Sequence, residues 1–391
     1  MSQLLTTDVL IVGGGIAGLW LNARLRQQGY NTLLIEQQSL GGAQTVKSQG
    51  IIHGGTKYAL QGALTGSSEA IANMPERWRA ALNGTGELDL QGVELLSNAH
   101  YLWSPGSIAG NITSFFASKA MRGRVDQVKG AALPPALQHP QFKGRVYRLA
   151  ELVLNVPSLI QRLAELAGDS LLQAKQLKPL YNNQAQLIGL QADNYLVQAQ
   201  RVVLCAGEGT AELLNALQLQ QPKQQLRPLH MVLVKGQALK PLYAHCLGGG
   251  SKPRITITTH PTTDSEWVWY LGGNLAEAEG VARSADEQIR HAQQELAELV
   301  PWLDQTQLSW QTLRVNRAEP AQSGLVRPDN AFLAEHDRLL VGWPTKLALA
   351  PDLSDRVLHH LTQHAIQPTA AQTYPDLPRP VVAQPAWETL F

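Results

Sequence analysis

The chain has 391 residues, 44% of them apolar and 16% charged, a composition typical of a globular protein large enough for two domains. Its 32 basic and 31 acidic side chains nearly cancel, which argues against nucleic-acid binding. No stretch approaches 18 consecutive apolar residues, the N-terminus lacks the features of a signal peptide, and there are only two cysteines. We therefore expect a cytoplasmic protein without a transmembrane segment, with peripheral attachment to a membrane left open.

The first 36 residues predict a strand, a glycine-rich turn, a helix and a second strand. These elements are residues 8–12, Gly13-x-Gly15-x-x-Gly18, residues 17–28 and residues 32–35. In such a βαβ unit the first glycine permits a tight turn, the second lets a pyrophosphate approach the backbone, and the third lets helix and strand pack closely. The pyrophosphate is expected at the helix N-terminus and the adenosine ribose on Glu36. The spacing alone serves NAD and FAD equally well.

Later elements alternate between helices and strands. A Gly/Ser/Thr-rich loop with a short helix near Tyr58 leads to a helix over 69–82, and residues 84–148 are irregular. The further predictions are helices over 158–167 and 210–217, a strand over 201–207, an antiparallel sheet within 227–275, a helix capped at 284–287 and running to 299, a strand over 339–342 and a helix over 351–365.

Apolar α/β elements thus return at 201–217 and 339–365, far from the first βαβ unit. An NAD dehydrogenase usually has one contiguous nucleotide domain, so this interruption favours a long cofactor held by distant segments. We expect a discontinuous FAD-binding domain, a substrate or cap domain and an extended C-terminal tail on the surface. Their bounds are 1–75 with 150–217 and 325–366, 76–149 with 218–324, and 367–391.

Four of these segments resemble the D-amino-acid-oxidase-type flavoprotein superfamily. They are Gly13-Gly14-Gly15-Ile16-Ala17-Gly18, Glu36, Cys205-Ala206-Gly207 and the strand, loop and helix that begin at Leu339. The resemblance implies bound FAD and an α/β (α+β composite) fold. That fold has a glutathione-reductase-like FAD-binding Rossmann domain and a second domain whose antiparallel sheet covers the flavin.

Two shorter segments narrow the resemblance. Residues 48–58, Ser-Gln-Gly-Ile-Ile-His-Gly-Gly-Thr-Lys-Tyr, are similar to a loop of FAD-linked glycerol-3-phosphate dehydrogenases and L-2-hydroxyglutarate oxidases. Residues 345–350, Thr-Lys-Leu-Ala-Leu-Ala, stand where the glycerol-3-phosphate enzymes carry Gly-Lys-Leu/Trp-Thr-Thr. Both point to oxidation of a carbon that bears a hydroxyl. The chain lacks the C-terminal helical domain of typical glycerol-3-phosphate dehydrogenases, and residues 84–330 resemble neither family closely.

The residues expected to bind FAD lie in the glycine turn, in the loop after the second strand and in two later loops. They are Gly13, Gly15, Ile16, Ala17, Gly18, Glu36, Gln37, Thr45, Ser48, Gln49, Gly50, Ile52, His53, Ala206, Gly207, Gly342, Thr345, Lys346 and Leu347.

Two residues are the leading candidates for chemistry at the flavin. His53 is the first, because histidine is the residue type best suited to proton transfer near neutral pH. The two glycines that follow it let the backbone approach a planar ligand. Lys346 precedes a helix, so its charge and the helix dipole both favour negative charge near flavin N1 and the C2 carbonyl. A histidine that only touches FAD and a solvent-exposed lysine are the alternatives.

Substrate anchoring requires cations that hold a carboxylate or phosphate. Arg314 and Arg317 can pair with such anions bidentately, although their spacing puts them on opposite faces of a strand, and Glu319 could neutralise Arg317. Lys57 and Tyr58 are candidates by resemblance. On the expected roof sheet Tyr270 is the substrate-facing candidate, opposite Trp267 and Trp269. No spacing resembles a metal site.

The sequence therefore predicts an FAD-dependent dehydrogenase or oxidase acting on a small anionic substrate, such as a 2-hydroxy acid or a polyol phosphate. Amino acid or amine oxidation is the first alternative. A flavin-binding subunit without turnover is the second, because the basic stretch Lys119–Arg148 and the Pro-rich tail could dock a partner. Oxygen, a quinone and an electron-transfer protein all remain open as the electron acceptor.

Overall fold

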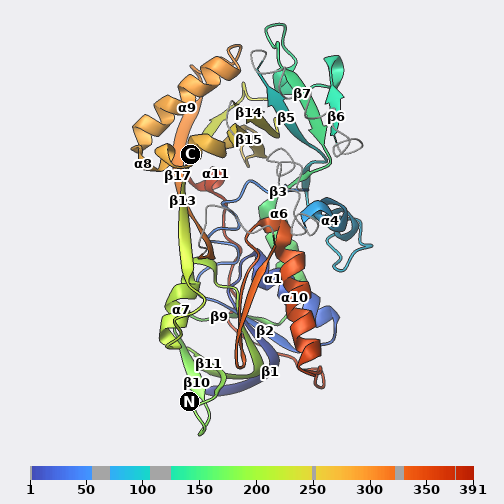
Figure 1. Cartoon of the computed structure of the whole chain (residues 1–391), viewed down its shortest axis with the longest axis vertical. Helices are drawn as coiled ribbons and strands as arrows, with labels where there is room; N and C mark the ends of the chain where they lie inside the picture. The colour runs from blue at the N-terminus through green and yellow to red at the C-terminus, as the bar shows by residue number, and fades with distance from the viewer. Residues whose placement is uncertain (1, 55–70, 106–124, 249–251, 322–329, 375) are drawn as a thin grey trace.

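Two large sheets, one below the other in Figure 1, organise the chain. The computed structural model describes residues 2–54, 71–105, 125–248, 252–321, 330–374 and 376–391. The helix expected near Tyr58 and the start of the basic stretch at Lys119 lie outside these residues. Within them, no helix is long and apolar enough to cross a membrane.

The first sheet holds the predicted βαβ unit at its centre. Its main path runs β10–β11–β12–β1–β2–β9, and β19 and β18 extend it beside β12. The strands are β1 (Gln3–Val12), β2 (Thr32–Glu36), β9 (Leu171–Gln173), β10 (Leu177–Tyr181), β11 (Leu187–Ala192), β12 (Tyr195–Leu204), β18 (Phe332–His336) and β19 (Leu339–Trp343). Five of them, β9, β2, β1, β12 and β19, are parallel, as expected for a nucleotide-binding sheet.

The central strands are buried on both faces. Side chains of Val9 and Ile11 enter one core and those of Leu10 and Val12 the other, because strand residues alternate between faces. The face that bears Val9 and Ile11 is covered by helices α1 (Ile16–Gln27), α6 (Val156–Ala167) and α10 (Ala350–Gln363). Helix α1 contacts both α6 and α10. The short helix α7 (Thr210–Ala216) contributes to the other core.

The second sheet is the predicted antiparallel roof. Its order is β17–β13–β16–β15–β14–β5–β7–β6, and only β14 and β5 pair in parallel. The strands are β5 (His100–Ser104), β6 (Val125–Val128), β7 (Arg145–Leu149), β13 (Gln224–Gly236), β14 (Ala244–Leu247), β15 (Pro253–Pro261), β16 (Trp267–Gly272) and β17 (Ser309–Pro320). Helix α9 (Ala285–Leu299) begins at the predicted capping box of Ser284 and Glu287, and the one-turn helix α8 (Glu279–Ala282) precedes it.

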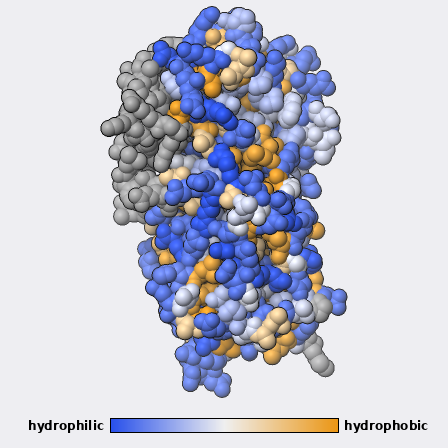
Figure 2. All heavy atoms as spheres, turned by 90° about the vertical axis from the view of Figure 1, so that its right-hand side faces the viewer, coloured by the Kyte–Doolittle hydropathy of each residue, from blue (hydrophilic) through white to orange (hydrophobic). Residues whose placement is uncertain are grey.

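A small third sheet lies between the two large ones. Its order is β3–β8–β4, with β3 at Ile51–Ile52, β8 at Leu152–Leu154 and β4 at Leu95–Ser97. Helix α4 (Met74–Leu82) packs beside β3. Figure 2 shows the side of the molecule that bears α4 and α10, where most of the surface is hydrophilic and apolar side chains are scattered.

The C-terminal tail corrects one expectation. It is extended over most of its length, but it is not only a surface segment. Thr369 hydrogen-bonds the carboxylate of Asp8, Val382 bridges to Leu40, and the tail ends in the short helix α11 (Ala386–Thr389). Trp387 in α11 is 4% exposed and stacks on His260 at 3.9 Å, because a large indole gains by burial against the roof sheet.

Candidate functional site

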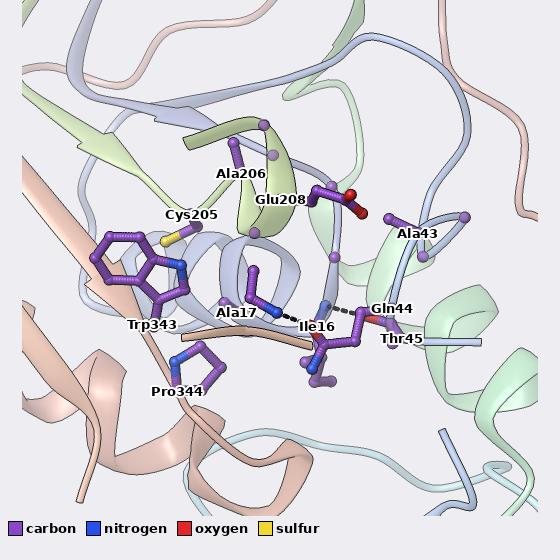
Figure 3. A pocket seen from close by; sticks show the side chains of 18 of the residues that line it. Ile16, Ala17, Ala43, Gln44, Thr45, Cys205, Ala206, Glu208, Trp343 and Pro344 are labelled. Atoms are coloured by element: carbon purple, nitrogen blue, oxygen red, sulfur yellow. Dashed lines mark hydrogen bonds between the residues drawn. The ribbon is translucent and has the colours of Figure 1, made fainter. Parts of the chain in front are cut away.

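A cavity of about 510 Å³ opens at the carboxyl ends of the parallel strands, where α/β sheets bind ligands. Its walls come from segments far apart in the sequence, including part of the roof strand β17 (Figure 3). They are the glycine turn with the start of α1, residues 35–39, most of 41–48, residues 205–209, parts of 315–318 and residues 342–347.

The glycine turn has the geometry that a diphosphate requires. Gly13 has φ +111°, and a Cβ there would lie 2.5 Å from the carbonyl oxygen of Cys205. A Cβ on Gly18 would lie 2.0 Å from the carbonyl oxygen of Gly13, so only glycine lets helix and turn approach. The first turn of α1 holds no acidic residue, and the backbone N–H of Ile16 donates to Thr45 Oγ1 at 3.1 Å (Figure 3). An anion is therefore favoured at this helix end.

Glu36 lies at the end of β2, on the cavity wall. Its carboxylate accepts hydrogen bonds from the backbone N–H of Gly14 at 2.6 Å and of Gln38 at 2.9 Å. Each carboxylate oxygen retains a further lone pair, so the group can also accept from ribose hydroxyls. The turn, the helix end and this acid together fit the adenosine diphosphate part of FAD.

The cavity wall also includes Thr345, Lys346 and Leu347, from the loop between β19 and α10. The Lys346 charge acts on Glu319, a nearly buried carboxyl group. Burial raises the pKa of Glu319, while Arg227 at 3.5 Å and Lys346 act in the opposite direction. Cys205 also lines the cavity, and burial raises the pKa of its thiol to about 12, so it is no nucleophile near neutral pH.

Most of the residues expected to bind FAD line this cavity. They are Gly13, Gly15, Ile16, Ala17, Glu36, Gln37, Thr45, Ser48, Ala206, Gly207, Gly342, Thr345, Lys346 and Leu347. The sequence reasoning missed several other lining residues, among them Ala43, Gln44, Glu208, Asn316 and Trp343. Gln44 holds the roof to the loop, because its Oε1 accepts from the backbone N–H of Ala318 at 3.0 Å.

The remaining expected FAD-binding residues do not line the cavity: Gly18, Gln49, Gly50, Ile52 and His53. Gly18 acts through packing, as described above. Gln49 Nε2 donates to the carbonyl oxygen of Tyr270 at 2.8 Å and so ties the loop to the roof. Gly50, with φ +70°, lies against the carbonyl of Leu154, and Ile52 is buried in β3.

The substrate and anchoring candidates require correction. Tyr270 is fully buried and its hydroxyl donates to the carbonyl of Lys47 at 2.9 Å, so it supports the loop and offers no substrate contact. Arg314 is exposed, and its guanidinium donates to the carbonyls of Val281 and Arg283 at 2.8 Å each, outside the cavity.

Arg317 is also outside the cavity lining. Its Nη2 lies 3.4 Å from Glu277 Oε1, whereas Glu319 pairs with Arg227 rather than with Arg317. Neither arginine of β17 therefore lines the cavity. Lys57 and Tyr58 lie outside the described residues.

His53 has a buried carboxylate partner that the sequence reasoning missed. Its Nδ1 lies 3.2 Å from Glu151 Oε2, and Glu151 Oε1 accepts from the backbone N–H of Gly54 at 3.0 Å. Strands β3 and β8 pair antiparallel with Ile52 opposite Leu152, and the same register puts His53 opposite Glu151. The sequence held one signal of this partner: Glu151 is a charged residue directly before the apolar run 152–154.

The charge of Glu151 is stabilised although the side chain is only 1% exposed. Burial alone would raise its pKa, but the hydrogen bond and charge of His53, the charge of His100 and the Gly54 N–H together lower it. His245 completes the group: its ring stacks on His53 at 5.9 Å and meets His100 at 4.3 Å. A hydrogen bond of 2.7 Å joins His245 Nδ1 and Thr256 Oγ1.

The parallel sheet, the glycine turn, Glu36 and the antiparallel roof define a dinucleotide-binding protein of the two-domain flavoprotein type. The chain belongs to the FAD dependent oxidoreductase family, whose model matches residues 8–344. It is thus an FAD-dependent enzyme, and the resemblance to the D-amino-acid-oxidase-type superfamily, the fold class and the cofactor are confirmed.

Three similar proteins illustrate the match. The "Probable FAD-dependent oxidoreductase PA4991" of Pseudomonas aeruginosa is 65% identical over 391 residues, with complete coverage of both chains. Its crystal structure superposes with a TM-score of 0.90 at 59% identity, covering 100% of this chain and 99% of that one. Glycine oxidase from Geobacillus kaustophilus has a TM-score of 0.66 at 16% identity, covering 95% and 98%. FAD-bound L-alpha-glycerophosphate oxidase from Mycoplasma pneumoniae has a TM-score of 0.64 at 14% identity, covering 95% of this chain and 97% of that one. At these identities, the similarity of both oxidases to this chain shows the fold alone.

Proposed function

We propose that this enzyme oxidises a carbon that bears a hydroxyl group in a small anionic substrate, of the 2-hydroxy acid or polyol phosphate type. The proposed proton acceptor is His53. The observation that carries the proposal is the hydrogen bond of 3.2 Å between His53 Nδ1 and the buried Glu151 carboxylate. We also retain as part of the proposal the division into a cofactor domain and a substrate domain.

Glu151 determines which nitrogen of His53 is basic. A carboxylate only accepts hydrogen bonds, so Nδ1 carries the proton and the lone pair is on Nε2. Because Glu151 is held by the Gly54 N–H as well, the imidazole is fixed in both tautomer and orientation. A base prepared in this way can accept a hydroxyl proton without first reorganising.

Oxidation of an alcohol needs such a base more than oxidation of an amine does. The hydroxyl proton must leave for a carbonyl to form, whereas a neutral amine carries a lone pair that can form the C=N bond directly. Bound FAD supplies the acceptor of the hydride equivalent, and Thr345, Lys346 and Leu347 would hold that end of the cofactor. Lys346 adds a positive charge at this wall.

The experiment is an anaerobic panel on purified, FAD-loaded protein, with loss of flavin absorbance as the readout. The panel contains 2-hydroxy acids, glycerol phosphates and, as the competing class, primary and secondary amino acids. We expect one hydroxylated anion to reduce the flavin. Reduction by amino acids alone would assign the enzyme to amine oxidation, and reduction by no member would support a non-catalytic subunit.

The same reduced protein then identifies the electron acceptor. Mixing it with air-saturated buffer, with a soluble quinone or with an electron-transfer dye gives three reoxidation rates under one set of conditions. Fast reoxidation by oxygen would define an oxidase. Reoxidation by the quinone or the dye alone would define a dehydrogenase.

A further inference from the structure

A second group of ionisable side chains lies at the end of the first sheet that faces away from the cavity. Glu335 is on the edge strand β18, His360 is in the last turn of α10, and His364 is the C-cap residue directly after that helix. In the antiparallel pair of β18 and β19, Phe332 lies beside Trp343 at the cavity, whereas Glu335 lies beside Leu340, further down the strand. One ligand atom from each of the three residues lies within 4.8 Å of the others.

The separations within this group suit a metal ion better than an ion pair. Glu335 Oε2 is 3.5 Å from His360 Nδ1, and Glu335 Oε1 is 3.3 Å from His364 Nε2. Hydrogen bonds from nitrogen to oxygen usually measure about 2.7–3.2 Å, so both contacts are long. Ligand atoms bound tetrahedrally to zinc at about 2.0–2.1 Å lie about 3.3–3.4 Å apart. This is close to the distance between each imidazole nitrogen and the carboxylate oxygen nearest to it.

The two imidazoles are also prepared as ligands. The carbonyl of His360 accepts a hydrogen bond of 2.9 Å from His364 Nδ1, so the lone pair of His364 is on Nε2, the atom nearest Glu335. Histidines that bind metals commonly donate their second ring N–H to a backbone carbonyl in this way. The two rings stack at 4.0 Å.

We propose that Glu335, His360 and His364 bind one divalent transition-metal ion, with water as the remaining ligand. Zinc is the ion we expect. Two imidazole nitrogens and one carboxylate oxygen suit zinc and its neighbours, whereas magnesium and calcium prefer oxygen alone. The sequence predicted no metal site, because the histidines at i and i+4 obtain their third ligand only through the packing of α10 on β18.

The site would join two elements that flank the cofactor loop. Strand β18 pairs with β19, which leads into residues 342–347, and α10 begins at Ala350 directly after that loop. A metal ion that binds only the folded chain stabilises it by mass action. The expected consequence is a structural clamp beside the loop that carries Lys346, without a part in the chemistry.

The test uses tag-free, FAD-loaded protein that has been stripped with a chelator and then titrated with zinc chloride. Calorimetry and competition with a chromophoric chelator give stoichiometry and affinity, and the melting temperature is recorded with zinc and with magnesium. Glu335→Gln and His364→Ala should each lower the affinity for one equivalent of zinc at least tenfold. Each should also abolish the zinc-dependent rise in melting temperature. His359→Ala removes an exposed imidazole of the same helix and should change neither readout.

The group of His53, Glu151 and His245 also has ligand atoms within 4.8 Å of one another, so it needs its own control. The zinc equivalent assigned to Glu335 should persist in Glu151→Gln. Wild-type protein without saturable zinc binding, or equal binding by the Glu335 and His364 variants, would overturn the proposal. Glu335 is 44% exposed, so its variant carries the test if His364→Ala fails to fold.

Discussion

Replacing Glu151 by glutamine is the sharpest test of the proposed base. Glutamine has the size of glutamate, but it presents one acceptor and one donor where His53 Nδ1 and the Gly54 N–H both require acceptors. If the amide oxygen faces Gly54, the NH₂ group donates a hydrogen bond to Nδ1. The ring then carries its proton on Nε2, the nitrogen that should be basic. If the amide is flipped, two donors meet at Gly54.

The expected loss follows from the hydrogen bond that disappears. Hydrogen bonds to charged groups contribute about 1.5–3 kcal/mol, and about 1.4 kcal/mol corresponds to a factor of ten. We expect the rate constant of anaerobic flavin reduction to fall roughly 10- to 150-fold, with substrate affinity changed less. Glu151→Asp keeps the acceptors and should recover part of the rate.

The control is Glu87→Gln, which removes a carboxylate from a partly buried ion pair with Arg77 and leaves the His53 group intact. It should affect stability without changing the reduction rate. If Glu151→Gln has a native melting temperature, a full complement of FAD and the wild-type reduction rate, then Glu151 does not orient a catalytic base. The reasoning above would then be wrong.

Three further predictions follow from the fold. Gly18→Ala places a methyl group 2.0 Å from the Gly13 carbonyl oxygen, so the purified variant should carry much less FAD per chain, as measured by flavin absorbance. Trp387→Ala should lower the free energy of unfolding by about 3–5 kcal/mol in denaturant titrations, because Trp387 is buried against His260 and Tyr270. The reduction rate should be retained, because the contacts of His53 are with Glu151 and His245. The pKa of Glu151 is lowered in the folded chain, so its contribution to stability is present above its ordinary value near 4.5 and is lost as the pH falls through the lowered pKa. Acid titrations of wild type and Glu151→Gln should therefore converge below that window, and parallel curves throughout would refute the assignment.

Features that depend on short stretches of sequence were predictable. The glycine spacing, the buried strand beside it and Glu36 all lie within one βαβ unit, and the cavity forms where they predict it. The loop at 345–347 was found by resemblance and also lines the cavity. Local pattern sufficed there because the carboxyl ends of parallel strands meet at one edge of the sheet.

Features that depend on which face of a strand is covered were not predictable. The roof strand β17 does line part of the cavity, but its lining residues are Val315, Asn316 and Ala318 rather than the two arginines. Arg314 finds carbonyl acceptors near α8, a one-turn helix whose position depends on tertiary packing. Tyr270 has the polarity of a substrate contact, but its hydroxyl is bound by a carbonyl of the loop below.

The pairing of His53 with Glu151 shows why the proposed site of proton transfer was hidden from the sequence reasoning. The two residues are 98 positions apart, and they meet only because β3 and β8 pair in one particular register. A shift by one residue would turn every side chain of β8 to the opposite face and move the carboxylate away from the imidazole. The paired strands are short and almost wholly buried, and this burial fixes the register. The apolar residues of the small third sheet therefore determine where the proposed base His53 and its partner Glu151 meet.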